Sequence, residues 1–296
     1  MIQNFDYWGN HTFDTDTNTL TWRRHCGVFS NVMVLMHCLM DLRLKNIIPQ
    51  KIKTDLTEYN NFDLYDGVFE LNDSKIEEWK NFNTDQIRNM RHNTSPNLYG
   101  FGMSQHQIDL QVTSLLVDSY FNFTNDVKNK TFEFKNKYKI QEGESAFIWW
   151  RKTDKIHEIT WFKPTARYPE TDSVLKFLKP YKNVYMQTDD PNVFSEFLKV
   201  GNITCLDVFN RNKFFVDKDV FKNGFHIDHK DTSDENFRKK YGMTRKDYIV
   251  GLAALVNIAS KSTQFIGYPG NISLFVSLVR KNFNNVVIFK DHEELF

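Results

Sequence analysis

The chain has 296 residues, of which 41% are hydrophobic and 25% are charged. This composition is typical of a soluble globular protein with one large or two ordinary domains and a real hydrophobic core. Lysine plus arginine (38) nearly balance aspartate plus glutamate (37), which gives a net charge of +1. A broad basic field for a nucleic-acid backbone or an anionic membrane is therefore excluded, and any phosphate binding must be local.

The three cysteines, Cys26, Cys38 and Cys205, are widely spaced and form no CxxC pair. An odd, scattered set fits neither a disulfide framework nor a zinc site, so a reducing compartment is expected. The first residues lack a basic region followed by an apolar one, and no run of 18 apolar residues occurs. These features predict a cytoplasmic protein without a transmembrane segment.

The first stretch, residues 1–22, is polar and aromatic and suggests a short hairpin around residues 19–22. Within it, Asp14-Thr15-Asp16 resembles the DxD that binds a metal in some sugar transferases. Aspartates in a Thr- and Asn-rich loop are more often turn formers, and we favour that interpretation. No metal is expected.

A helix is predicted from Ser30, a natural N-cap, to about Leu44, because apolar residues recur at helical spacing. The loop before it, around Gly27, is the ordinary opening of a nucleotide- or sugar-binding α/β unit, since a helix amino terminus accepts anions. A tight turn before a core helix needs no ligand, so both interpretations stay open.

Residues 50–105 are poorly periodic, with a possible strand region at 59–70 and a helix fragment at 76–81. Helices are predicted at 105–120 and 127–140. The polar, glycine-containing segment 141–144 then indicates a domain boundary. We expect an amino-terminal α/β domain at 1–140 and a carboxy-terminal domain at 141–296.

The second half alternates between strands and helices, which predicts a parallel sheet with crossover helices. The predicted strands are 146–150, 183–187, 203–206, 264–266 and 285–289, and the predicted helices are 171–179, 191–200, 245–259 and 271–280.

Polar side chains follow three of these strands at the point where each strand ends. The carboxyl ends of parallel strands share one edge of a sheet, where ligands bind, so cations, carboxylates and a helix amino terminus would converge there on a charged, hydroxylated ligand. Each segment alone could also be a solvated turn or ordinary helix capping. The residues are Arg151, Lys152, Asp154 and Lys155 after the first strand, Thr188, Asp189 and Asp190 after the second, and Gly267 to Asn271 after the third.

These segments resemble motifs of a known superfamily. Residues 149–155, WWRKTDK, look like the (H)xRRTDK signature of the α-1,6-fucosyltransferases, and MQTDDP at 186–191 resembles their ATDDP motif. The loop from Gly27 to Asn31 is similar to the GxFGN loop of the related protein O-fucosyltransferases. The resemblance covers the second half continuously and the first half only at this loop.

The resemblance implies a GT-B glycosyltransferase, with two Rossmann-like domains facing a cleft, a glycan-binding first domain and a donor-binding second domain. It would be metal-independent and inverting, would need no cofactor, and would move fucose from GDP-fucose to a glycan hydroxyl. Arg151 would stabilise the diphosphate leaving group and Lys155 would assist, because a guanidinium stabilises such charge best. The other expected donor-binding residues are Gly27, Asn31, Asp154, Asp189, Asp190, Gly270 and Asn271, with Lys152 and Tyr168 in support.

An inverting displacement also needs a base for the acceptor hydroxyl. Glu158 is the candidate, since the family places a catalytic glutamate shortly after its TDK, and His157 is a competitor that the family does not predict. The sequence departs from the family at Trp149, which replaces a histidine, and at Pro269-Gly270-Asn271, which replaces Ser-Ser-Gln. The donor could therefore be another nucleotide sugar.

Two other classes remain for comparison. A non-catalytic nucleotide-sugar or glycan-binding protein with the same fold would tolerate replacement of Glu158 and Lys155. A dinucleotide oxidoreductase is disfavoured, because no GxGxxG follows a predicted strand with an acidic residue about 20 positions later.

Overall fold

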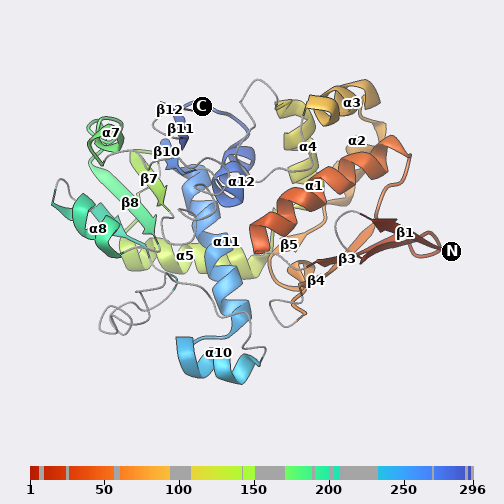
Figure 1. Cartoon of the computed structure of the whole chain (residues 1–296), viewed down its shortest axis with the longest axis horizontal. Helices are drawn as coiled ribbons and strands as arrows, with labels where there is room; N and C mark the ends of the chain where they lie inside the picture. Colours follow the sequence, from red (N-terminus) through yellow and green to blue (C-terminus); the bar gives the residue numbers. More distant parts are fainter. Residues whose placement is uncertain are drawn as a thin grey trace, which may run out of the picture. The chain divides into compact units, whose positions relative to one another are not determined.

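The computed structural model divides the chain into two compact units (Figure 1). Unit 1 comprises Met1–Lys130 and His229–Ala254, and unit 2 comprises Thr131–Asp228 and Leu255–Phe296. The sequence predicted a single domain boundary between residues 140 and 141, with residues 229–254 in the second domain. This division stays a prediction. The structure describes residues 1–6, 10–24, 27–56, 61–93, 108–141, 143–150, 171–188, 191–199, 203–206, 208, 233–268, 270–290 and 293–294.

The main sheet of unit 1 has the order β1-β2-β3-β4. Strands β1, β2 and β3 are antiparallel, and the β2–β3 pair confirms the predicted hairpin. Strand β4 runs parallel to β3, because helix α1 connects the two. The strands of this unit are β1 (Ile2–Asp6), β2 (Asn10–Asp14), β3 (Thr19–Arg24), β4 (Lys51–Leu56), β5 (Phe69–Glu70) and β6 (Asn122–Phe123).

Helix α1 (Val28–Leu44) is buried on nearly all sides and forms the centre of unit 1. It begins at Val28 after Gly27, so the prediction that Ser30 is the N-cap was wrong. The reason is that the backbone of Gly27 is extended and its carbonyl accepts the first helical hydrogen bond, from Asn31 N at 3.0 Å. The other elements are η2 (Leu64–Asp66), α2 (Asp73–Asn81), α3 (Thr84–Asn93), α4 (Leu110–Tyr120) and α10 (Asp234–Tyr241).

Unit 2 is built on a six-stranded sheet of order β12-β11-β10-β7-β8-β9. All neighbours are parallel except the short edge strand β12, which pairs antiparallel with β11. Its elements are β7 (Ser145–Trp150), α7 (Thr171–Leu175), β8 (Asn183–Thr188), α8 (Pro191–Leu198), β9 (Ile203–Cys205), β10 (Gln264–Gly267), α12 (Asn271–Arg280), β11 (Val286–Lys290) and β12 (Glu293–Glu294). Helices α5 (Asn125–Tyr138) and α11 (Arg245–Lys261) have residues in both units.

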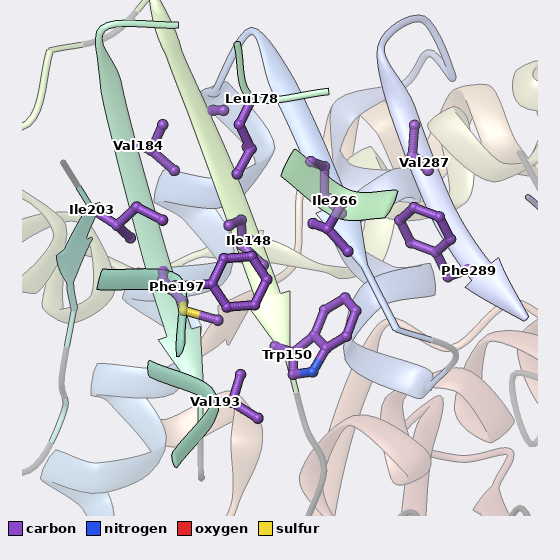
Figure 2. Close-up of a cluster of buried hydrophobic side chains, with 13 residues drawn as sticks. Ile148, Trp150, Leu178, Val184, Val193, Phe197, Ile203, Ile266, Val287 and Phe289 are labelled. Atoms are coloured by element: carbon purple, nitrogen blue, oxygen red, sulfur yellow. The ribbon is translucent and has the colours of Figure 1, made fainter. Parts of the chain in front are cut away.

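One face of this sheet carries a continuous apolar core. Figure 2 shows Val184, Ile148, Ile266 and Val287 on four neighbouring strands, with Phe197 of α8 packed over them. Every residue of β7 is buried, as expected for a central parallel strand covered on both faces. The predicted parallel sheet is therefore confirmed.

Three helices depart from the prediction. Helix α7 ends at Leu175, short of Lys179, because Phe177 N and Leu178 N bond to carbonyls three residues back and tighten the chain into turns. Helices α3 and α10 were not predicted. No helix in the described part of the chain is long and apolar enough to cross a membrane.

Candidate functional site

The strand order of unit 2 reverses between β7 and β10. From β7 the chain moves outward to β8 and β9 on one side, and it then returns to β10 and β11 on the other. This is the order of a doubly wound dinucleotide-binding sheet, in which ligands bind beyond the carboxyl ends of the strands at the reversal point. The carboxyl ends of β7 and β10 are therefore the candidate site.

The three strand ends that the sequence predicted to converge are neighbours. Trp149 of β7 pairs with Gly267 of β10 on one side and with Gln187 of β8 on the other. Beyond the last pair, Tyr268 N donates to Trp149 O at 3.2 Å, so β7 and β10 stay together to the edge. The segments of the chain that follow β7, β8 and β10 therefore all begin at the same edge of the sheet.

Helix α12 begins at the end of β10 and points its amino terminus to this edge. Its N-cap is Gly270, which has no side chain to cap the first amides, and its first helical bond is Leu274 N to Gly270 O at 3.1 Å. The amides before Leu274 and the positive end of the helix can therefore accept an anion such as a phosphate.

Gly267 lets α12 approach the sheet closely. A Cβ at Gly267 would lie 2.6 Å from Ser273 Oγ and 2.8 Å from Ser273 Cβ, distances that real side chains do not show. Because Ser273 lies in the first turn of α12, this contact fixes the helix amino terminus on the face of the sheet opposite α7 and α8.

Three buried polar atoms at this edge of the sheet and at the start of α12 have no hydrogen-bond partner in the structure: Trp149 Nε1, Gln187 Oε1 and Asn271 Oδ1. In parallel strands, paired residues project from the same face, so Trp149 and Gln187 lie on the face that carries α12. Trp149 is only 2% exposed. Unpaired polar atoms at such depth cost free energy, and native proteins keep them where a ligand or water supplies the partner.

The opposite face at this edge is an aromatic cluster that holds the strand ends in place. The ring of Trp150 lies 5.8 Å from that of Tyr268 and 6.0 Å from that of Phe197. Figure 2 shows Trp150 at the tip of β7, beside Phe197 and Phe289. The site therefore has a rigid base.

Most of the predicted site residues lie outside the described part of the chain, and their assignment stays a prediction. In the sequence, Arg151 directly follows Trp150, the last residue of β7, and Asp189 directly follows Thr188, the last residue of β8. These residues are Arg151, Lys152, Asp154, Lys155, His157, Glu158, Tyr168, Asp189 and Asp190. Gly270 and Asn271 are described and lie at the amino terminus of α12.

The two predicted donor-binding residues of unit 1, Gly27 and Asn31, contact each other. Asn31 is fully buried, its Nδ2 donates to Gly27 O at 3.3 Å, and its Oδ1 accepts from Trp22 Nε1 at 3.3 Å. Trp22 in turn stacks on His11, with ring centroids 3.6 Å apart. These contacts give Asn31 a structural role at the start of α1, and a role in donor binding stays a prediction.

Asp14 and Asp16 form the turn of the β2–β3 hairpin, as the favoured interpretation predicted. Asp14 Oδ1 accepts from Asp16 N at 3.1 Å, and Asp14 Oδ2 accepts from Thr17 Oγ1 at 2.8 Å. These bonds, that from Thr17 first, lower the pKa of the Asp14 carboxyl. Across the described residues, no group of three or more His, Cys, Asp or Glu side chains is placed to hold a metal ion.

Sequence reasoning missed Trp149 and Gln187 as site residues. Trp149 was noted only as a departure from a family histidine, and Gln187 only as part of a strand and of MQTDDP, without a role of its own. The available signal was their position, because both are the penultimate residue of a strand whose end was already a candidate.

No protein-family model and no curated protein matches the chain in sequence. Several solved structures match it in fold. The apo-form of POFUT1 matches with a TM-score of 0.50 and 10% identity, covering 93% of this chain and 99% of that chain. NodZ α-1,6-fucosyltransferase matches with a TM-score of 0.46, 7% identity and coverage of 91% and 94%. FUT1 of Arabidopsis thaliana matches with a TM-score of 0.41, 10% identity and coverage of 90% and 69%.

The chain is similar in fold to the GT-B fucosyltransferases. The fold assignment rests on the similarity to POFUT1, which has the highest TM-score of the three. The matched region includes parts of both units of the chain. The expected fold class and the expected resemblance to these fucosyltransferases are thereby confirmed at the level of the fold. At 10% identity the likeness extends to architecture and not to activity.

Proposed function

We propose that this protein is an inverting, metal-independent glycosyltransferase that transfers fucose from GDP-fucose to a hydroxyl group of a glycan. The observation that carries the proposal is the group of unpartnered polar atoms at the sheet edge and at the start of α12, at the strand-order reversal of a chain with a GT-B fold. A diphosphate, with its hydroxylated sugar, supplies the negative charge and hydrogen-bonding groups that such a site lacks.

GDP-fucose is the first donor to test. POFUT1, whose apo-form has the similar fold, has also been solved with GDP and with GDP-fucose. The departures at Trp149 and at Pro269-Gly270-Asn271 leave another nucleotide sugar as the second candidate.

In the proposed reaction, the acceptor hydroxyl oxygen attacks the anomeric carbon while the bond from that carbon to the diphosphate oxygen breaks. The hydroxyl proton passes to a base, for which Glu158 is proposed and His157 is the alternative. Arg151, assisted by Lys155, neutralises the charge that builds on the departing diphosphate, and the amides of α12 add donors. Asp154 orders the cations, and Asp189 and Asp190 line the site.

The first test is a calorimetric screen of the wild-type protein against GDP, UDP, ADP and CMP, followed by hydrolysis and transfer assays with the corresponding nucleotide sugar. GDP is expected to bind most tightly. Arg151→Ala is expected to weaken GDP binding about tenfold or more and to reduce transfer by about 10²–10³. Arg88→Ala is the matched control, since Arg88 is an exposed arginine on α3 whose partner is Asp85.

Glu158→Gln separates chemistry from binding. It is expected to leave the dissociation constant of GDP unchanged and to remove turnover, because the amide keeps the shape of the side chain and cannot take a proton. Full transfer activity in Arg151→Ala, or in both Glu158→Gln and His157→Ala, contradicts the proposal. Retained activity in Glu158→Gln with loss in His157→Ala identifies His157 as the base.

A further inference from the structure

A concave surface lies in unit 1, between helices α2 and α4. Its volume is 720 Å³, within the range of roughly 300–1,000 Å³ that small-molecule sites occupy. We call it the α2/α4 groove. Neither the predicted site residues nor the edge of the unit 2 sheet contributes to it.

Each wall of the α2/α4 groove is one stripe of a helix. Gln111, Ser114, Leu115 and Asp118 line it from α4 at helical spacing, over about 10 Å of helix. Ser74, Glu78, Asn81 and Phe82 face them from α2 and its end. The groove is therefore an elongated surface formed by two regular elements.

Internal hydrogen bonds hold the two walls in place. Ser119 Oγ of α4 donates to Lys75 O of α2 at 2.9 Å, and Asn72 N at the start of α2 donates to Ser119 O at 3.0 Å. At the other end of α2, the buried Arg43 of α1 donates from Nε to Trp79 O at 3.1 Å and from Nη2 to Phe82 O at 3.1 Å. The groove is thus preformed, which lowers the entropic cost of binding.

The charged side chains of the groove, Lys75, Glu77, Glu78 and Asp118, are engaged in ion pairs and electrostatic contacts. Lys75 Nζ contacts both oxygens of Glu78, at 2.7 and 2.8 Å, and Lys80 Nζ lies 3.4 Å from Glu77 Oε2. In the lining itself the carboxylates of Glu77, Glu78 and Asp118 outnumber Lys75 by 3 to 1, because Lys80 is not one of the lining residues, so an anionic ligand is repelled. A cationic partner gains little, since Lys75 already pairs with Glu78 and interacts with Asp118, and Lys80 already pairs with Glu77.

The remaining lining fits an uncharged polyhydroxylated ligand. Asn81, Gln111 and Ser74 each make one hydrogen bond within the protein, from Asn81 Nδ2 to Glu77 O, from Gln86 Nε2 to Gln111 Oε1 and from Ser74 Oγ to Asn72 Oδ1. Asn81 Oδ1, Gln111 Nε2 and the oxygen of Ser74 keep hydrogen-bonding capacity, and Ser114 adds a further hydroxyl. Phe82 and Leu115 add an apolar surface, and the ring of Phe82 is supported by Trp79, with centroids 6.3 Å apart. Sugar rings present hydroxyls at their edges and C–H groups on their faces, so both parts find a complement.

We infer that the α2/α4 groove is a binding subsite for the neutral part of the acceptor glycan. The choice of a saccharide rests on the proposed glycosyltransferase function. Within that function, the groove selects acceptors that carry neutral sugars and disfavours sialylated, uronic or sulfated ones.

The test is a titration of ¹⁵N-labelled full-length protein with neutral oligosaccharides, such as maltotriose and N-acetylglucosamine trimers, alongside sialyllactose and a lysine-rich peptide. A neutral oligosaccharide is expected to shift the amide resonances of α2 and α4 saturably. Ser114→Arg, which fills the groove with a cationic side chain, is expected to weaken that binding about tenfold or more, and Gln111→Ala to weaken it less. Asn89→Arg adds the same side chain to the exposed surface of α3 and is expected to bind as wild type does.

GDP binding, measured on the same variants, separates the two proposals. If GDP binds to all of them and no neutral oligosaccharide shifts α2 and α4, the groove assignment is wrong and the donor proposal stands. The assignment is also overturned if sialyllactose or the lysine-rich peptide binds the groove more tightly than every neutral sugar. If saccharides bind as expected and no nucleotide does, the transferase proposal fails and the groove stands as a glycan-binding site.

Discussion

His37 is a buried histidine in the middle of α1, 2% exposed, and its Nδ1 has no hydrogen-bond partner in the structure. Burial, and then the positive charge of Arg91, lowers the pKa of His37 to about 3. In the unfolded chain a histidine takes up a proton near pH 6.5. Below that pH the unfolded state therefore binds more protons than the folded state does.

The stability of the protein is accordingly expected to fall as the pH drops from 6.5 toward 3. At pH 5 the contribution of His37 to this loss is about 2 kcal/mol in the free energy of unfolding. In His37→Leu, the difference between urea unfolding at pH 7.5 and at pH 5 should shrink by that amount. An unchanged difference would show that His37 does not titrate as its burial requires.

For the candidate site, the sequence suggested residues whose charge follows a strand and overlooked those whose polar atoms are buried in one. Arg151 and Asp189 stand out because cations and carboxylates end two apolar runs. Trp149 and Gln187 belong to those runs. Whether Trp149 Nε1 and Gln187 Oε1 find a hydrogen-bond partner depends on side chains that are distant in the sequence and close in the fold. The sequence alone cannot reveal such a deficit.

At the scale of elements, the close contact of β10 and α12 depends on one glycine. Gly267→Ala is expected to reduce the free energy of unfolding by about 1–3 kcal/mol, because its Cβ would meet Ser273 Oγ at 2.6 Å. Chemical denaturation measures this change. Gly270→Ala is the control, since the nearest atom to its Cβ, Tyr268 O, is 3.9 Å away, and a loss below about 1 kcal/mol is expected.

Adding Ser273→Gly to Gly267→Ala removes the colliding side chain and should restore part of the lost stability. The two substitutions must then be non-additive, as expected for residues in direct contact. Two results would show that the contact with Ser273 is not the reason for a glycine at position 267. One is an equal loss of unfolding free energy in Gly267→Ala and Gly270→Ala, and the other is strict additivity of the free-energy changes of Gly267→Ala and Ser273→Gly.

The strands and helices of unit 2 were predictable because short apolar runs and helical stripes alternate with few interruptions. In unit 1 the same approach failed at residues 50–105, where α3 was missed. There, short elements depend on distant partners: β5 exists because Phe69 and Glu70 pair with Phe123 and Asn122, more than 50 positions away. Local patterns carry little information about such pairs.

At the scale of the whole molecule, the sequence predicted an α/β fold and a parallel sheet, but not the order of its strands. The reversal between β7 and β10 arises because the chain passes through residues 206–263, with α10 and α11, before it adds the next strand. This order brings the carboxyl ends of β7 and β10 together at the reversal point, where ligands bind in sheets of this kind.

Binding of a nucleotide diphosphate at the amino terminus of α12 is best tested by GDP titration of Gly270→Asp and Gly270→Asn. Both side chains cap a helix about equally well, and Gly270 has open space around its Cβ. They differ by one negative charge placed where the phosphates should lie. Calorimetry should show GDP binding about tenfold or more weaker in Gly270→Asp than in Gly270→Asn, since a like charge within a few ångströms costs more than about 1.4 kcal/mol at an effective dielectric constant of about 20. Equal affinities in the two variants, or no GDP binding by the wild-type protein, would contradict the account.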